Sequence, residues 1–418
     1  MDLSIISLLF LLGCIVLGFV LKRNIGLLAI AVALILGRLG HIEDSVIISG
    51  FNSNLFLILL GVSYLFTIAV NNRTLELLAR KTITLAGNRV NIIPLVLVVL
   101  GTIISMAGPG TIPALALCAM LSTTLAKELD IDPLPFTVCS FMGAAAGGMS
   151  PIAPTGIIAL EIAARQGYSG FGIPYMLTMM AAAFIFGAVY YFAAGIFKLK
   201  SENMHAVLKQ VEPLNRNQWI TVAGIGAMMI MVIFLKVNVG LASFLIAGIL
   251  NLIGVCDERR IFANISWSTL IMVCGVGVLM NVIITLGGIN QLSAALASLM
   301  NTYTAPPLMC FGAGIMGWFS STSGVVIPTL IPTVPGIITH LPDVTPLSLI
   351  SALSVGSQMA GISPGSTGGA LALASYVTLF KPNIEQKNRY FIRLFLTSIF
   401  AVLFVSALGF ADFYNWIY

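Results

Sequence analysis

The amino-acid sequence predicts an all-α polytopic membrane protein made of two inverted repeats, each with five transmembrane helices and one re-entrant hairpin. Three observations predict this fold class. Hydrophobic residues make up 58% of the 418 residues and charged residues only 8%, whereas a soluble domain carries about 25% charged residues. Several segments approach the roughly 20 apolar residues that a helix needs to cross a bilayer. The third observation is an internal repeat.

Residues of the first half return in the second half at a fixed offset of 214 positions. The segment 22–27 (KRNIGL) returns as 236–241 (KVNVGL), and 61–62 (GV) returns as 275–276 (GV). With a slip of one residue, Ile-Pro at 112 returns as Ile-Pro at 327. In a strongly apolar chain, such a duplication is typical of secondary transporters whose binding site lies between the halves.

The first repeat is predicted over residues 1–200. Its scaffold helices lie within 4–71, near 4–21, 25–40 and 52–71. The first of them lacks the basic leading region and the cleavage site of a signal peptide, so we expect it to be a permanent helix. The rest of the repeat consists of an amphipathic surface helix at 71–89, a hairpin at 92–127, a broken helix at 134–164 and a closing helix at 172–197.

The second repeat is predicted over residues 218–418, after a polar cytoplasmic linker at 201–217. Its elements follow the order of the first repeat, except for the surface helix. They are scaffold helices within 218–286 (near 218–235, 239–254 and 267–286), a hairpin at 307–334, a broken helix at 347–376 and a closing helix at 391–411.

The basic residues test this topology independently. Five crossings in each half place the halves in opposite orientations. If the N-terminus lies outside, one face receives all of the 20 Lys and Arg residues except Arg38, Arg165 and Lys236. By the positive-inside rule that basic face is cytoplasmic. We therefore expect a bacterial-type inner (plasma) membrane protein with both termini in the periplasm.

The composition disfavours other classes of partner and chemistry. The net charge of +5 resides in short loops between spans, so we expect the lipid bilayer and no nucleic acid as partner. The six cysteines form no CxxC pair and are interpreted as small core residues. The segment 361–365 matches the G-x-S-x-G pattern of hydrolases around Ser363, but no strand precedes it and the three histidines lie in loops or near helix ends. We therefore expect no enzyme, with an intramembrane serine hydrolase as a remote alternative.

Four interruptions rich in Gly, Pro, Ser and Thr divide the apolar segments, at 105–111, 147–156, 320–324 and 361–369. A proline inside a helix removes a hydrogen bond, and in lipid the freed carbonyl groups need protein partners or a cavity. Each break alone is compatible with a packing kink. Four breaks at matching positions instead predict broken helix ends that meet at mid-membrane, where amide ends attract anions and carbonyl ends attract cations.

The residues at these breaks are the candidate site. A single Ser or Thr in a membrane helix more often bonds to its own backbone, so the cluster carries the prediction. We expect the substrate to contact Ser105, Gly108, Gly110, Thr111, Thr155, Ser320, Thr322, Ser323, Ser366 and Thr367. We expect Na⁺ at Ser105, Gly110, Gly147, Ser150, Ser320, Gly324, Gly361 and Ser363.

Charged residues are missing from both hairpin tips and from the centres of both breaks. An obligate proton exchanger would place a titratable group there. An anion that is held only by dipoles and hydroxyls needs compensating charge, which a co-transported Na⁺ would supply. The sequence therefore favours coupling to Na⁺, with H⁺ as the alternative.

The segments 55–66 (LFLILLGVSYLF) and 71–76 (NNRTLE) resemble the N-terminal signature of MatC-type dicarboxylate (malonate) carriers. The segments 108–114 (GPGTIPA) and 147–151 (GGMSP) fit the same pattern. These carriers are related to divalent-anion/sodium symporters. The resemblance implies an elevator-type homodimer in which the helices within 4–71 and 218–286 form the scaffold and the remaining elements move.

Two departures from the relatives concern the hairpin tips. In sodium-coupled relatives each tip carries Ser-Asn-Thr, but neither tip of this chain contains the Asn. Antiporter and arsenite relatives carry an acidic residue at the first tip, where this chain has Gly108 and Pro109. We expect an importer of small dicarboxylates (malonate- or succinate-like C3–C4 diacids) by cation symport. A passive channel, H⁺ coupling, or a transporter or exchanger of another small anion (sulfonate, monocarboxylate or arsenite) remains an alternative.

Overall fold

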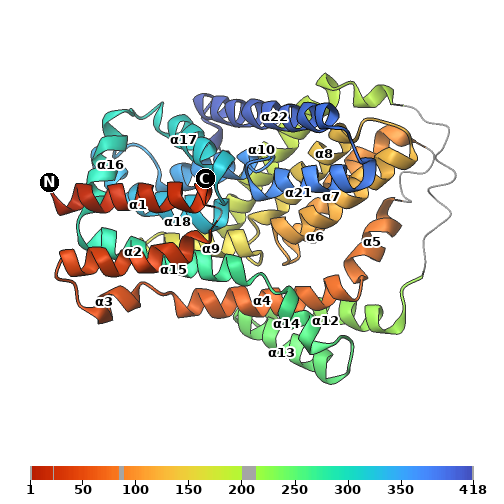
Figure 1. Cartoon of the computed structure of the whole chain (residues 1–418), viewed down its shortest axis with the longest axis horizontal. Coiled ribbons are helices and arrows are strands. Elements are labelled where there is room, and N and C mark those ends of the chain that lie inside the picture. Colours follow the sequence, from red (N-terminus) through yellow and green to blue (C-terminus); the bar gives the residue numbers. More distant parts are fainter. Residues whose placement is uncertain (1, 22, 84–88, 200–212, 417–418) are drawn as a thin grey trace.

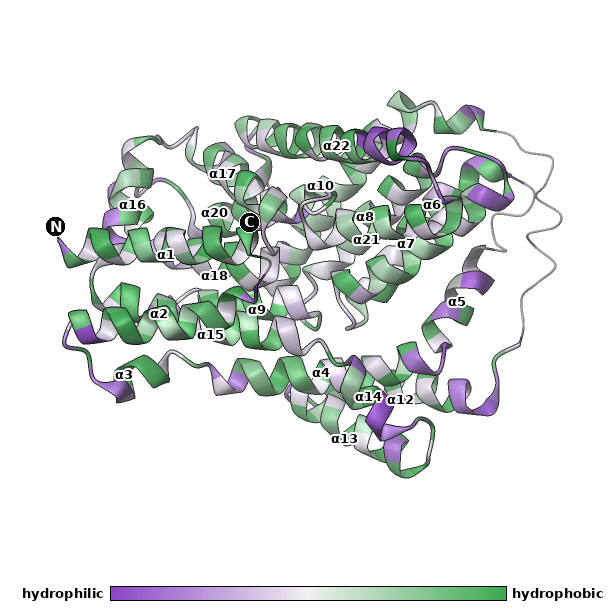
Figure 2. Ribbon diagram, in the orientation of Figure 1, coloured by the Kyte–Doolittle hydropathy of each residue, from purple (hydrophilic) through white to green (hydrophobic). Residues whose placement is uncertain are grey.

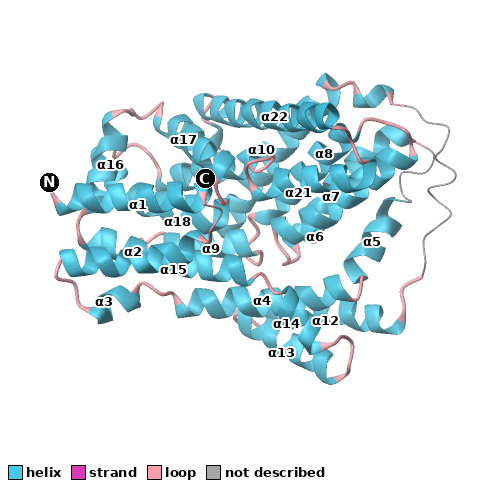
Figure 3. Cartoon of the chain, in the orientation of Figure 1, coloured by secondary structure: helices cyan, strands magenta, loops and turns pink. Residues whose placement is uncertain are grey.

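The computed structural model describes residues 2–21, 23–83, 89–199 and 213–416, which form helices and loops and no strand (Figure 3). Six helical segments within this described part are long and apolar enough to cross a membrane. Hydrophilic residues gather at helix ends, above all around α5 and the start of α22, while apolar residues cover the helices between them (Figure 2). The all-helical membrane fold is therefore confirmed.

The helices of the first half follow the predicted order (Figure 1). The hairpin consists of α6 and α7, and the broken helix consists of α8 and α9. The bounds are α1 (Leu3–Val20), α2 (Ile25–Leu39), α3 (Asp44–Ser49), α4 (Ser53–Asn71), α5 (Thr74–Ile83), α6 (Ile93–Met106), α7 (Thr111–Glu128), α8 (Pro133–Gly148), α9 (Pro154–Arg165) and α10 (Gly172–Ala193).

The second half repeats this plan. Its hairpin consists of α17 and an irregular second arm, and its broken helix consists of α20 and α21. The bounds are α12 (Arg216–Ile233), α13 (Val239–Leu252), α14 (Glu258–Asn264), α15 (Trp267–Thr285), α16 (Gly288–Ser298), α17 (Ala305–Phe319), the π-helical turn η4 (Thr322–Val326), α18 (Ile327–Leu330), η5 (Ile331–Thr333), α19 (Val334–His340), α20 (Pro346–Ala360), α21 (Thr367–Phe380) and α22 (Ile384–Phe410). Most of the predicted linker 201–217 lies outside the described residues.

Three helices, α3, α14 and α16, were not predicted. The short helices α3 and α14 begin at Asp44 and Glu258. Helix α16 begins at Gly288, and its counterpart in the first half is the predicted surface helix α5, which begins at Thr74. Both pairs keep the offset of 214 positions, so each half contains a short helix before its third long helix and a surface helix after it. Helix α16 escaped prediction because it carries no charged residue, unlike α5 with its Glu, Arg and Lys.

Glycines allow two equivalent helix crossings between the halves. Helix α2 packs on α15, and its repeat counterpart α13 packs on α4. A Cβ added to Gly275 would overlap the carbonyl oxygen of Gly26, and a Cβ added to Gly61 would overlap that of Gly240. These four positions are related by the repeat offset. Small residues let helix backbones approach closely in a membrane, where apolar burial does not drive association.

The hairpins pack on the broken helices in the same manner in both halves. Helix α6 lies along α8, and α17 lies along α20. A Cβ on Gly143 of α8 would overlap the carbonyl oxygen of Val98, and a Cβ on Gly356 of α20 would overlap that of Cys310. Each broken helix is therefore held against the first arm of its hairpin by direct backbone contact.

The second arm of the second hairpin is irregular and buried. It passes from a π-turn through short α- and 3₁₀-helical pieces, with prolines at 328, 332 and 335. Its end, α19, packs on α16, the helix that directly precedes α17. Both ends of the hairpin therefore lie near α16, as a re-entrant loop requires. The missing N–H groups of the prolines explain the broken helix, and such backbone is tolerated at membrane depth only inside protein.

The glycine crossings predict opposite effects of the same substitution at two sites. Gly61→Ala should destabilise the protein by about 1–3 kcal/mol because its Cβ has to displace backbone of α13. Gly248→Ala, in α13 with nothing within 4 Å of the added Cβ, should instead stabilise it by about 0.5–1 kcal/mol through helix propensity. Thermal unfolding of the detergent-solubilised variants measures both. Equal shifts in the same direction would contradict the crossing.

Candidate functional site

Four helix N-termini meet where the breaks converge. They belong to α7, α9, the π-turn η4 and α21, which begin at Thr111, Pro154, Thr322 and Thr367. Two of them touch directly, since a Cβ on Gly110, the residue before α7, would lie 2.7 Å from Cδ of Pro154. The turn that leads into α7 needs glycine, because Gly108 and Gly110 adopt φ of +139° and +79°.

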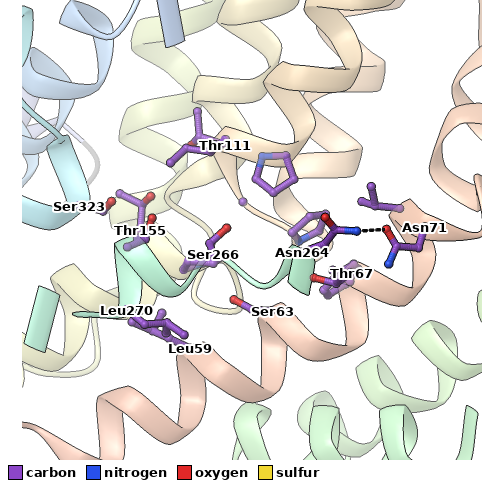
Figure 4. Close-up of a pocket in the computed structure, with 18 residues that line it drawn as sticks. Leu59, Ser63, Thr67, Asn71, Thr111, Thr155, Asn264, Ser266, Leu270 and Ser323 are labelled. Carbon is purple, nitrogen blue, oxygen red and sulfur yellow. Dashed lines mark hydrogen bonds between the residues drawn. The ribbon is translucent and has the colours of Figure 1, made fainter. Parts of the chain in front are cut away.

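A cavity of about 340 Å³ separates these N-termini from the scaffold helices. Ser63 and Thr67 of α4 face Thr111, Thr155 and Ser323 across it (Figure 4). The complete lining comprises Leu59, Ser63, Phe66, Thr67, Val70, Asn71, Pro109, Gly110, Thr111, Ile112, Pro113, Pro154, Thr155, Asn264, Ser266, Thr269, Leu270 and Ser323. Both halves of the chain therefore contribute to one space.

A second, smaller cavity of about 40 Å³ continues from the first, since Thr111, Ile112, Thr155 and Ser323 line both. Its other walls come from the second broken helix, from the tip of the second hairpin, and from α7 and α8 of the first half. These walls are Leu115, Phe141, Ser321, Thr322, Gln358, Gly361, Ser366, Thr367 and Gly368. Residues from all four helix N-termini therefore line these two adjoining cavities.

Backbone amides at the N-termini lack protein acceptors. The first N–H groups of any helix have no partner within the helix. At α7 these are the amides of Thr111 and Ile112, and at α21 those of Thr367 and Gly368; within the described residues none of them donates to a protein acceptor. The same holds for Thr155 of α9. Such amides, together with the helix dipoles, attract negative charge.

Side-chain hydrogen bonds tie the hairpin tips to the second broken helix. Gln358 donates from Nε2 to Oγ1 of Thr111 over 2.7 Å, which joins α20 to the tip of the first hairpin. Thr322 donates to the carbonyl oxygen of Ser357 over 3.0 Å and accepts from the Ser357 hydroxyl over 2.9 Å. Both tips are therefore fixed on one turn of α20.

Eight of the predicted site residues line these cavities. Thr111, Thr155 and Ser323 line both cavities, and Gly110 lines only the larger one. The residues that line only the smaller cavity are Thr322, Gly361, Ser366 and Thr367. The hydroxyls of Thr155, Ser366 and Thr367 have no hydrogen-bond partner among the described residues, which leaves them available to a ligand.

The other predicted residues in the first half lie behind the cavity wall. Gly108 packs on the ring of Phe66, and Gly147 packs on the backbone of α6 beside Ser105. Ser105 is fully buried, and its hydroxyl lacks a partner. The hydroxyl of Ser150 accepts a long hydrogen bond (3.4 Å) from the amide of Ile152.

The remaining predicted residues in the second half are engaged in the protein. Ser320 donates to the carbonyl oxygen of Met316, and Ser363 donates to that of Trp318 while accepting from the amide of Gly365. Gly324 packs on the side chain of Met272. The contacts of Ser363 are thus to backbone groups, and no histidine or carboxylate is among them.

Sequence reasoning missed Gln358 and the scaffold side of the cavity. Gln358 is 4% exposed and is the only amide side chain in α20. On the scaffold side, Asn264 donates to Oδ1 of Asn71 over 3.0 Å, and Nδ2 of Asn71 is buried without a partner. An amide within an apolar helix was the available signal for Gln358. Ser63 and Thr67 gave none, because their relation to the tips exists only in three dimensions.

The cavities combine apolar walls with hydroxyl and amide groups and contain no charged side chain among the described residues. In the part of the chain that the structure describes, no Asp, Glu, Lys or Arg lines either of them. A charged solute in these cavities would therefore meet amides, hydroxyls and helix dipoles and no ionised partner.

Comparisons with known proteins agree with this architecture. Residues 1–148 match the family described as the dicarboxylate carrier protein MatC N-terminus. This match confirms the resemblance over the first 148 residues and indicates a multi-pass membrane carrier. No curated protein sequence matches the chain significantly.

A solved structure shares the fold. The chain is similar to the structure described as "Crystal structure of the Alcanivorax borkumensis YdaH transporter reveals an unusual topology". The TM-score is 0.58 at 13% sequence identity, over 87% of this chain and 86% of that chain. At this identity the similarity concerns the fold alone.

The hydrogen bond from Gln358 predicts a measurable loss of stability. Gln358→Leu removes the donor to Thr111 and should lower the free energy of unfolding by about 1–3 kcal/mol. Ser354→Ala, one turn earlier on α20, removes a buried hydroxyl without a partner and should have little effect. Thermal unfolding in detergent compares the two. A larger loss in the Ser354 variant would contradict the assignment.

Proposed function

We propose that the protein is a secondary active transporter that imports small dicarboxylates. The observation that carries this proposal is the convergence of four helix N-termini on charge-free cavities lined by both halves. Unpaired amides and hydroxyls on opposite sides suit a solute with a carboxylate at each end. The match of residues 1–148 to a dicarboxylate carrier family supports the same substrate class.

The size of the site supports a short diacid. The larger cavity, at about 340 Å³, lies at the lower end of the range of small-molecule sites. One carboxylate would contact the N-termini of α7 and α9 through Thr111 and Thr155. The other would contact the second half through Ser323, Ser366 and Thr367. Such an arrangement selects C3–C4 diacids by the distance between their carboxylates.

Coupling to Na⁺ is part of the proposal, because two negative charges in an uncharged cavity need compensation. The first hairpin offers the better cation site. The Ser105 hydroxyl is fully buried and unpartnered beside Gly147, at the first break, so its oxygen is free to bind a cation. In the second half, the equivalent Ser320 already donates to Met316.

The proposed mechanism is alternating access between two inverted repeats. The glycine crossings of α2 with α15 and α4 with α13 would form the rigid scaffold. The hairpins, broken helices and closing helices would move as a unit against it, in a homodimer in a bacterial inner membrane with both termini periplasmic. The basic residues of α5 and α14 and those around the start of α22 would then lie in the cytoplasm.

A transporter of another small anion is the second candidate. The cavities offer no ionised side chain that selects carboxylate over sulfonate, and hydroxyls and amides bind both. The substrate panel in the experiment below separates these cases.

Uptake into proteoliposomes tests the function directly. We expect saturable, counterflow-competent uptake of radiolabelled malonate or succinate that an inward Na⁺ gradient accelerates. Gly148→Ala should abolish most of it, since the added Cβ would overlap Oγ1 of Thr111. Gly187→Ala, where the nearest atom is 3.7 Å away, should retain it. Uptake of sulfonates alone, or uptake that follows only a pH gradient, would contradict the proposal.

The cation site has its own test. Ser105→Ala should raise the Na⁺ concentration for half-maximal uptake about tenfold, because one charge-assisted ligand is lost. The matched control is Ser243→Ala in α13, which also removes a fully buried, unpartnered hydroxyl. An unchanged Na⁺ dependence in the Ser105 variant would exclude this serine as a ligand.

A further inference from the structure

A third cavity, of about 280 Å³, lies away from the proposed substrate site. It is bounded by α15, the loop before α4, the end of α9 and the second arm of the second hairpin. Its lining comprises Gly50, Asn52, Leu55, Ile162, Arg165, Gln166, Val273, Gly277, Met280, Asn281, Ile284, Pro328 and Pro332. None of these residues lines the two cavities described above.

This cavity is the repeat counterpart of the large one. Helix α4 lines the large cavity with residues 59, 63, 66, 67 and 70, and α15 lines the third cavity with 273, 277, 280, 281 and 284. Every pair differs by 214 positions, the offset of the sequence repeat. Pro113 and Pro328, which the repeat aligns with its one-residue slip, line the large and the third cavity respectively.

The large and the third cavity extend to different parts of the hairpins and to opposite ends of α9. The large cavity reaches the hairpin tip and the start of α9, at Thr111 and Thr155. The third cavity reaches Pro328 and Pro332, beyond the second tip, and the opposite end of α9 at Arg165. The substrate hydroxyls are therefore accessible from the α4 side in this structure, and the α15 side is closed off from them.

Arg165 distinguishes the third cavity chemically. It is exposed at the last residue of α9, and no ion pair involves it within the described residues. The neighbouring carboxylate of Glu161 accepts a hydrogen bond from Asn54, and Arg38 is paired with Asp44 at 2.8 Å. Within the described ranges, no charged residue lines the large cavity. An unpaired guanidinium at a cavity mouth is suited to bidentate binding of a carboxylate.

We infer that the third cavity is the second mouth of the transport path, on the opposite membrane face, and that Arg165 binds the incoming dicarboxylate there. This inference rests on the proposed function. Because the repeat relates the two cavities, a shift of the hairpins and broken helices toward α15 would extend the third cavity to the substrate hydroxyls as the first one closes. By the distribution of basic residues, the Arg165 mouth lies outside, where substrate is captured for import.

Sided cysteine labelling tests the two mouths. Val70 and Ile284 are repeat partners that line the two cavities and are similarly exposed, at 47% and 43%. Val70→Cys and Ile284→Cys are placed in a Cys256→Ser background, because the other native cysteines are buried. A membrane-impermeant maleimide should label Ile284→Cys only from the outer face and Val70→Cys only from the inner face. Labelling of both from one face would overturn the second mouth.

Kinetics of external uptake test Arg165. Arg165→Gln should raise the KM for malonate about fivefold, the effect of one partly screened charge contact, whereas Arg165→Lys should stay within about twofold. The control Arg38→Gln removes an exposed arginine that already has a partner and should leave KM unchanged. The effect of Arg165→Gln should shrink at high ionic strength and be absent in efflux from the inner face.

The outcomes separate this inference from the proposed function. Normal wild-type uptake together with an unaltered KM in Arg165→Gln would overturn only the role of Arg165. Absence of dicarboxylate uptake in the wild type would overturn the proposed function and this role together. An equal rise of KM in the Arg38 control would show a general surface-charge effect and would also overturn the role.

Discussion

The whole structure depends on one constraint, which is that broken helices in a membrane need protein partners for their backbone groups. In water the amides at the start of α7 or α21 would bond to solvent. Inside a bilayer they persist only where protein or a polar cavity surrounds them. The chain meets this need by bringing four broken ends together, and the backbone groups that would otherwise destabilise the fold are the ones that we propose to bind an anion.

Close helix packing makes this arrangement possible. Gly143 and Gly356 let each broken helix lie against the first arm of its hairpin, backbone to backbone. The bond from Gln358 to Thr111 then joins the two halves at the tips. Because both tips bond to one turn of α20, the proposed substrate-binding groups of the two hairpins keep a fixed spacing, as the proposed selection of diacids by length requires.

Much of this fold was predictable from the sequence. Runs of Gly, Pro, Ser and Thr within apolar segments marked all four breaks. Most predicted elements begin within three residues of an observed one, but α22 begins at Ile384, ahead of the predicted start at 391. Helix α16 was missed because it carries no charged residue that would mark it as a surface helix like α5. The scaffold side of the cavity was missed because Ser63 and Thr67 look like ordinary hydroxyls of a membrane helix. Their function depends on what faces them, and a single sequence does not contain that information.

The proposed direction of transport depends on residues at which the two repeats differ. Ser105 and Ser320 occupy equivalent positions, yet one hydroxyl is unpartnered and the other bonds to its own helix. Two identical halves would bind a cation equally and would treat both membrane faces alike. Divergence at Ser105 confines the proposed cation site to one hairpin, and the charge of Arg165 has no counterpart among the residues that line the large cavity. In the proposed mechanism the duplicated helices supply two access routes, and a few unmatched residues make them unequal.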